Sequence, residues 1–104
     1  MDKIEDLAEI FKALSDPTRL KLIKLLGECK PGVCEGGPLC VNALAHRLGV
    51  TQSAVSQHLR ILKHAGVVHG ARQGTYMHYS LDPDGLKKYK TAIRETLGDS
   101  FTIE

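Results

Sequence analysis

Two short helical patterns around a tight turn constrain the fold more than any other part of this 104-residue sequence. The first, ALAHRL, follows Asn42, which is a good helix N-cap, and ends at Gly49. The second covers residues 52–65, follows the N-cap residue Thr51 and is ended by Gly66. Because only Gly-Val-Thr separates them, the two patterns predict a helix-turn-helix.

The second of these helices has one face without acids. When successive residues are placed ~100° apart, its polar residues gather within an arc of about 140°. Serine, glutamine and arginine donate hydrogen bonds to phosphates and to base edges in the DNA major groove. A solvated face is the simpler alternative, but such faces usually mix both signs of charge. The arc therefore predicts a DNA-reading face consisting of Gln52, Ser53, Ser56, Gln57, Arg60, Lys63 and His64.

Charge is distributed unevenly along the chain, although the net charge is only +2. Residues 36–81 contain no Asp or Glu. The same stretch carries all five histidines and the cations Arg47, Arg60, Lys63 and Arg72. A basic, acid-free centre favours a phosphate backbone as partner, although chance could produce it in so short a chain. His58 lies in the apolar arc of its helix, where a core or hinge histidine is the natural interpretation.

The rest of the sequence predicts a mainly α chain with a small β-hairpin. A helix over residues 3–14 is followed by one over 17–26, with Asp16 or Ser15 as its cap and Gly27 as its end. VVHGARQGTYMHYSL then alternates as strands do, with a turn at Gly74, and Asp82 and Pro83 begin a last helix. The predicted order is therefore four helices, a hairpin and a last helix, which is typical of a winged helix-turn-helix. We expect residues 1–104 to form one such domain. Minor-groove or phosphate contacts are expected from the wing tip, formed by Arg72, Gln73, Thr75 and Tyr76.

Apolar stripes on the first and last helices predict a homodimer. A domain this short buries a limited share of its surface, so burial against a second copy is expected. The expected interface residues are Leu7, Phe11, Leu14, Leu86, Tyr89, Ile93 and Leu97.

Three segments together resemble the ArsR/SmtB family of metal-responsive winged-helix repressors: ALSDPTRLKLIKLL, LCVNALAHRLGVTQSAVSQHLRILKHAGVV and the Gly-Thr-Tyr wing ending in HYSL. The resemblance covers nearly the whole chain. It implies a homodimer through the first and last helices, paired recognition helices on an inverted-repeat operator, and release of DNA when an effector binds. Residues matching the family's DNA-reading surface are Gln52, Ser53, Ser56, Gln57 and Arg60.

The same resemblance implies a modified effector site. Members that sense thiophilic metals carry Leu-Cys-Val-Cys-Asp-Leu where this chain has LCVNAL. Cys40 keeps the first ligand, whereas Asn42 and Ala43 replace the second cysteine and the aspartate. The last helix lacks the histidines of the family's other metal site, so that site is expected to be absent.

Three cysteines follow one another with spacing C-x4-C-x5-C: Cys29, Cys34 and Cys40. Three thiolates suit trivalent arsenic or antimony, and cadmium or lead could use the same set. Zinc prefers four ligands, and His46 is a weak candidate for the fourth. Two alternatives stay open: a redox switch through a disulfide, and a structural Cys40 that is simply buried.

Other classes of function fit the sequence less well. A small thiol metal buffer or redox carrier would not need an acid-free helix face. No nucleophile–base set, phosphate loop or carboxylate pair indicates an enzyme. No run of about 18 apolar residues predicts a membrane span. The acidic start MDKIEDLAEI is unlike a signal peptide, so a cytoplasmic protein is expected.

Overall fold

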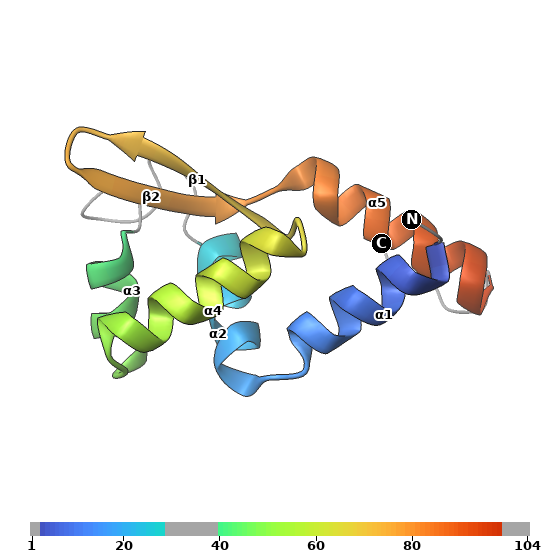
Figure 1. Cartoon of the computed structure of the whole chain (residues 1–104), viewed down its shortest axis with the longest axis horizontal. Helices are drawn as coiled ribbons and strands as arrows, with labels where there is room; N and C mark the ends of the chain where they lie inside the picture. The colour runs from blue at the N-terminus through green and yellow to red at the C-terminus, as the bar shows by residue number, and fades with distance from the viewer. Residues whose placement is uncertain (1–2, 29–39, 99–104) are drawn as a thin grey trace.

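Five helices and one hairpin follow one another in residues 3–28 and 40–98, which the computed structural model describes. Their order confirms the predicted winged helix-turn-helix (Figure 1). The elements are α1 (Lys3–Leu14), α2 (Pro17–Glu28), α3 (Val41–Leu48), α4 (Gln52–His64), β1 (Val68–Gln73), β2 (Tyr76–Leu81) and α5 (Pro83–Leu97). Within the described residues, no helix is long and apolar enough to cross a bilayer.

Side-chain caps fix where three of the helices begin, as the sequence predicts. The Asp16 carboxylate accepts from the backbone N–H groups of Thr18, at 2.8 Å, and Arg19, at 3.3 Å. Thr51 Oγ1 accepts from the backbone N–H of Ala54 at 3.1 Å, and the Asp82 carboxylate caps α5 in the same way. Each bond satisfies a donor that the first turn of a helix leaves without a partner.

The predicted cap of α3 is wrong. Cys40 occupies the N-cap position in an extended conformation, and Asn42 lies inside the first turn of the helix. In this extended conformation Cys40 forms an isolated β-bridge with His78 of β2. The helix therefore begins directly after this bridge, and the carbonyl of Cys40 accepts from the N–H of Leu44 at 3.0 Å. The bridge between Cys40 and His78 joins residues far apart in sequence, so local capping preferences do not reveal it.

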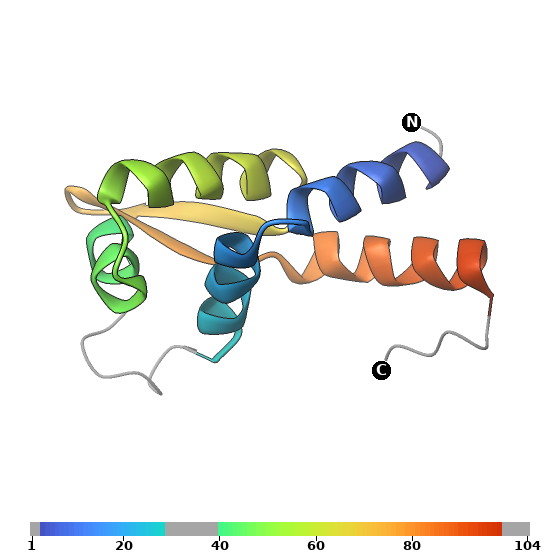
Figure 2. The same cartoon turned by 90° about the horizontal axis from the view of Figure 1, so that it is seen from below.

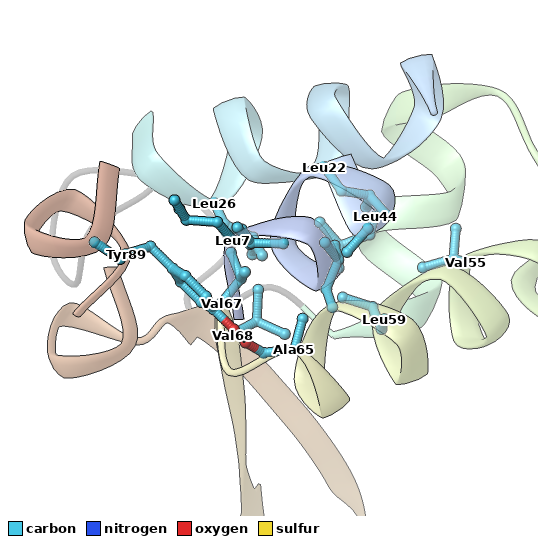
Figure 3. Packing of buried hydrophobic residues seen from close by; sticks show 14 of the residues in the cluster. Leu7, Leu22, Leu26, Leu44, Val55, Leu59, Ala65, Val67, Val68 and Tyr89 are labelled. Carbon is cyan, nitrogen blue, oxygen red and sulfur yellow. Dashed lines mark hydrogen bonds between the residues drawn. The ribbon is translucent and has the colours of Figure 1, made fainter. Parts of the chain in front are cut away.

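The helix-turn-helix is held together by an apolar core between α2, α3 and α4 (Figure 3). Leu22, Leu44 and Val55 are fully buried there, and Leu59 and Leu62 extend the same apolar side of α4. Gly49 ends α3 with a φ of 67°, a left-handed conformation that glycine adopts without strain. Because the apolar arc of α4 is buried, its polar arc faces outward.

The hairpin forms the wing. β1 and β2 pair antiparallel from Val68 opposite Leu81 to Gln73 opposite Tyr76, which leaves Gly74 and Thr75 as the turn. Gly74 has a φ of 66°, so the predicted turn position is confirmed. The hairpin tip and the start of α4 lie toward the same end of the molecule (Figure 1).

At the opposite end of the molecule, α1 and α5 lie side by side (Figures 1 and 2). The Tyr89 hydroxyl donates to the carbonyl of Ala65, which ties α5 to the end of α4, and burial raises the pKa of Tyr89. Lys88 of α5 lies 3.4 Å from the carboxylate of Asp6. Lys3 of α1 pairs with Glu95.

Candidate nucleic-acid interface

The polar residues of α4 form a continuous outward surface. All seven residues of the predicted DNA-reading face are exposed, whereas Val55, Leu59 and Leu62 on the other side of the helix are buried. The Thr51 cap and the core contacts fix the position of the helix. Its outward side chains therefore stand on a rigid support, which DNA reading requires.

His64 differs from the other residues of this face. Its Nε2 lies 3.6 Å from a carboxylate oxygen of Glu9 on α1, although its side chain is 84% exposed. The pair is an ion pair when the imidazole is protonated. Among the described residues, Glu9 is the one acid with an ion-pair contact to this face, and it lies at the C-terminal end of α4.

Gln52 makes a contact that sequence reasoning missed. Its Nε2 donates a hydrogen bond to Oδ1 of Asn42, which links the first turns of the two helices of the helix-turn-helix. The available signal was the position of these two amides at the starts of the two helices. Because asparagine favours the N-cap position, the sequence instead predicted that Asn42 caps α3.

The wing is the second part of the predicted interface. Arg72 and Thr75 are exposed on it, while for Gln73 and Tyr76 the structure describes the backbone positions at the end of each strand. An exposed arginine near the tip of a wing is suited to contact phosphates or to enter a minor groove.

His58 lies on the inner side of α4, as expected from its apolar arc. It is half-buried, and its Nδ1 is buried without a hydrogen-bond partner among the described residues.

The pKa of Asp16, at the start of α2, is lowered from its ordinary value. Burial acts to raise this pKa, but the N–H groups of Arg19 and Thr18 and the charges of His58 and Arg19 outweigh burial. The Asp16 carboxylate therefore stabilises the first turn of α2.

The predicted thiol site is described only at Cys40. This thiol is free and half-buried at the start of α3. Cys29 and Cys34 lie outside the described residues. Within residues 3–28 and 40–98, no three His, Cys, Asp or Glu side chains converge on a point that could hold a metal ion. A cavity of about 170 Å³ beside the thiol is lined by Cys40, Val41, Asn42, Gln52, Thr75 and Met77.

The predicted dimer residues divide into two groups. Leu7 and Tyr89 are buried within the protomer, whereas Phe11 and Leu97 are 47% and 48% exposed. Leu14, Leu86 and Ile93 are half-buried and line an apolar groove of about 270 Å³. The remaining lining residues of this groove are Ile10, Phe11, Ile23, Val67, Tyr89 and Lys90.

A helix-turn-helix with an acid-free outer helix and an adjoining wing defines a winged-helix DNA-binding protein. The family model described as "Bacterial regulatory protein, arsR family" matches residues 16–69, from the cap of α2 into the first strand of the wing. The chain belongs to this family and is a DNA-binding transcriptional regulator. The family is one of regulators, not of enzymes.

Curated relatives carry several kinds of description. The chain is 42% identical over 95 residues to an uncharacterized HTH-type transcriptional regulator of Methanocaldococcus jannaschii, covering 91% of this chain and 99% of that protein. It is 36% identical to a cadmium resistance regulatory protein CadC homolog of Staphylococcus aureus, over 80% of this chain and 63% of that one. It is 37% identical to the arsenical resistance operon repressor of Escherichia coli, and the match covers 72% of this chain and 58% of that protein.

Solved structures agree with the fold. One, described as a possible transcriptional regulator for arsenical resistance, superposes with a TM-score of 0.65 at 35% identity and covers 90% of this chain and 84% of its own. An ArsR-like transcriptional regulator from Rhodococcus superposes with a TM-score of 0.73 at 28% identity, and the match covers 88% of this chain and 79% of that protein.

Proposed function

We propose that this protein is a homodimeric repressor that places α4 in the major groove of an inverted-repeat operator and leaves the DNA when a soft ion binds its thiolates. The observation that carries the DNA-binding part is the exposed, acid-free face of α4 above a fully buried apolar face. Lys63 and His64, near the helix end, would contact phosphates, and the wing would follow the neighbouring groove.

Each polar side chain on α4 has a definite use in this arrangement. Arg60 can donate two hydrogen bonds to a guanine edge, and glutamine at 57 can pair with the donor and acceptor of an adenine. Ser53 and Ser56 bond either bases or phosphates. Every phosphate contact displaces counterions, so affinity falls steeply with salt.

A second copy of the chain is the proposed occupant of the apolar groove between α1 and α5. Phe11 and Leu97 are large apolar side chains that the protomer leaves half exposed. Ile4, on the same helix α1 as Phe11, is also a large apolar residue and is 63% exposed. Covering them in a two-fold dimer would place the two α4 helices for adjacent half-sites, which lie about 34 Å apart on DNA. Sedimentation of an 11.4 kDa monomer at micromolar concentration would contradict this arrangement.

The effector proposal is supported by the position of Cys40 and by the relatives named for cadmium and arsenical resistance. Cys40 lies where α3 meets the wing, so an ion held there would act on the wing and on the helix that supports α4. Asn42 offers an amide, not a thiolate, and is already bonded to Gln52. A three-sulfur site therefore needs Cys29 and Cys34, and trivalent arsenic or antimony suits such a site.

Only a small free-energy difference is needed for release. An ion that favours the non-binding state by about 1–3 kcal/mol weakens DNA affinity about 5–150-fold. Because the thiols must lose protons to bind the ion, the apparent affinity for it should weaken as pH falls.

One titration tests both parts of the proposal. Protein bound to its own promoter DNA is followed by fluorescence anisotropy while arsenite, antimonite, cadmium, zinc or diamide is added. Arsenite should release the wild type, and Cys34→Ser should bind DNA yet resist release. Release by diamide alone would establish the redox alternative. No release by any reagent would show that the thiols are structural, and absence of DNA binding would favour a thiol buffer.

A further inference from the structure

We infer that Asn42 is a positioning residue that fixes the side chain of Gln52 for reading a base. The inference rests on the proposed placement of α4 in the major groove. It assigns a function in DNA specificity to a residue that the helix-turn-helix pattern treats as part of the supporting helix.

The geometry places the two amides in contact at the entrance of the recognition helix. Gln52 is the first residue of α4, and its Nε2 donates to Oδ1 of Asn42 in the first turn of α3. Both residues are exposed, so the hydrogen bond is not required to satisfy a buried group. The Thr51 cap holds the backbone on the α4 side.

The remaining atoms of Gln52 match one base. Its amide has two N–H donors and one carbonyl oxygen, and the bond to Asn42 uses one donor. Among the residues that the structure describes, no other side-chain hydrogen bond engages Gln52, so the second donor and the oxygen are available as the pair that recognises N7 and the N6 amino group of adenine. A glutamine already held in one rotamer loses less side-chain entropy when it meets the base. Asn42 thus prepares Gln52 to distinguish adenine from guanine, whose O6 offers no donor.

A double-mutant cycle on operator affinity tests the inference. Gln52→Ala should weaken binding about 10-fold, which is within the range for a lost bidentate base contact. Asn42→Ala should weaken it about 5-fold, since it loosens Gln52 without removing it. The double variant should be no weaker than Gln52→Ala alone, because Asn42 acts through Gln52. Alanine is a good helix former, so the change at position 42 should not unfold α3.

Base discrimination provides the second measurement. Adenines in each half-site are replaced one at a time by guanine, and the loss of affinity is measured for each variant. Asn42→Asp keeps the acceptor oxygen, so it should retain wild-type discrimination at every position despite lower overall affinity. Asn42→Ala should lose discrimination at one adenine per half-site. Thr91→Ala, an exposed polar-to-alanine change on α5, serves as the control and should behave as the wild type.

The outcomes separate this inference from the proposed function. Additive effects of the two substitutions, or unchanged discrimination in Asn42→Ala, would overturn the role of Asn42 while α4 remains the reading helix. If Gln52→Ala binds as tightly as the wild type but Arg60→Ala does not, Gln52 reads no base and the inference fails alone. If neither substitution weakens binding, the placement of α4 fails and the inference fails with it.

Discussion

α4 and α5 are amphipathic helices of similar length, 13 and 15 residues, but their outward faces differ. α5 mixes acids and bases, and its Lys88 and Glu95 pair with Asp6 and Lys3 of α1. α4 carries serines, glutamines and cations without an acid. Charges of both signs on α5 can be satisfied within the chain. A face of one sign is suited to a partner of opposite charge, which for this family is DNA.

The two helices also differ in what their charges contribute. Exposed ion pairs such as those of α5 are worth about 0–1 kcal/mol and are screened by salt. A cation on the outward face of α4, placed against a phosphate or a guanine, would contribute to DNA affinity instead of to folding. The comparison therefore predicts that substitutions on the outward side of α4 change binding, whereas those on its inner side change stability.

The largest effect should follow from truncating the inner side of α4. Leu62 is 0% exposed, so Leu62→Ala removes packed methyl groups and leaves a cavity. We expect a loss of about 2–5 kcal/mol in the free energy of unfolding, measured by urea denaturation. The neighbouring exposed change Lys63→Ala should alter it by less than about 0.5 kcal/mol. Equal unfolding midpoints would show that α4 is not anchored through this face.

Charge reversal on the two outward faces should separate the helices next. Arg60→Glu introduces an acid into the DNA-reading face and should weaken operator binding about 100-fold or more, because a base contact is lost and phosphates are repelled. Lys87→Glu makes the same change at an exposed position of α5 and should shift affinity less than about 2-fold at 0.15 M salt, where distant surface charges are screened. Anisotropy titrations with identical DNA measure both. Similar losses for the two variants would mean that net charge alone drives binding.

Removing the cap of α4 should have an intermediate effect. Thr51→Ala deletes the hydroxyl that accepts from the N–H of Ala54 and should cost about 0.5–2 kcal/mol of stability. Thr51→Ser keeps the hydroxyl and should stay close to the wild type. Thermal unfolding followed by circular dichroism compares them, and a destabilised serine variant would show that the methyl group matters more than the cap.

The smallest effect is expected at the ion pair between α1 and α5. Both side chains are well exposed, Lys3 at 62% and Glu95 at 46%. Lys3→Ala should therefore change the free energy of unfolding by at most about 1 kcal/mol, and the difference should shrink in 1 M salt. A loss that persists at high salt would assign the stabilisation to packing of the lysine stem.

Much of the fold follows from local signals. Asp16, Thr51 and Asp82 begin helices because their side chains satisfy free N–H groups, and Gly74 turns the wing because its φ is positive. These effects depend on neighbouring residues, so the sequence alone predicts them. The polar arc of α4 was predicted in the same way, from helical periodicity.

The features that escaped prediction depend on contacts between distant residues. Cys40, which forms a bridge to His78, is the N-cap of α3, whereas Asn42 lies inside the helix and accepts a hydrogen bond from Gln52. Periodicity showed an apolar stripe on α5 but could not tell that Tyr89 is covered by its own protomer while Leu97 is not. The ion pair from Glu9 to His64 likewise requires knowing that α1 lies next to the end of α4.

Mapping the operator onto the protein by NMR tests the central claim most directly. Backbone and side-chain amide shifts are recorded for the wild type with increasing amounts of its promoter DNA. The account predicts the largest changes at Gln52, Gln57 and Arg60 of α4 and at the wing tip, with little change along the outward side of α5. Large shifts on α5 with an unchanged α4 would contradict the assignment of α4 as the DNA-reading helix.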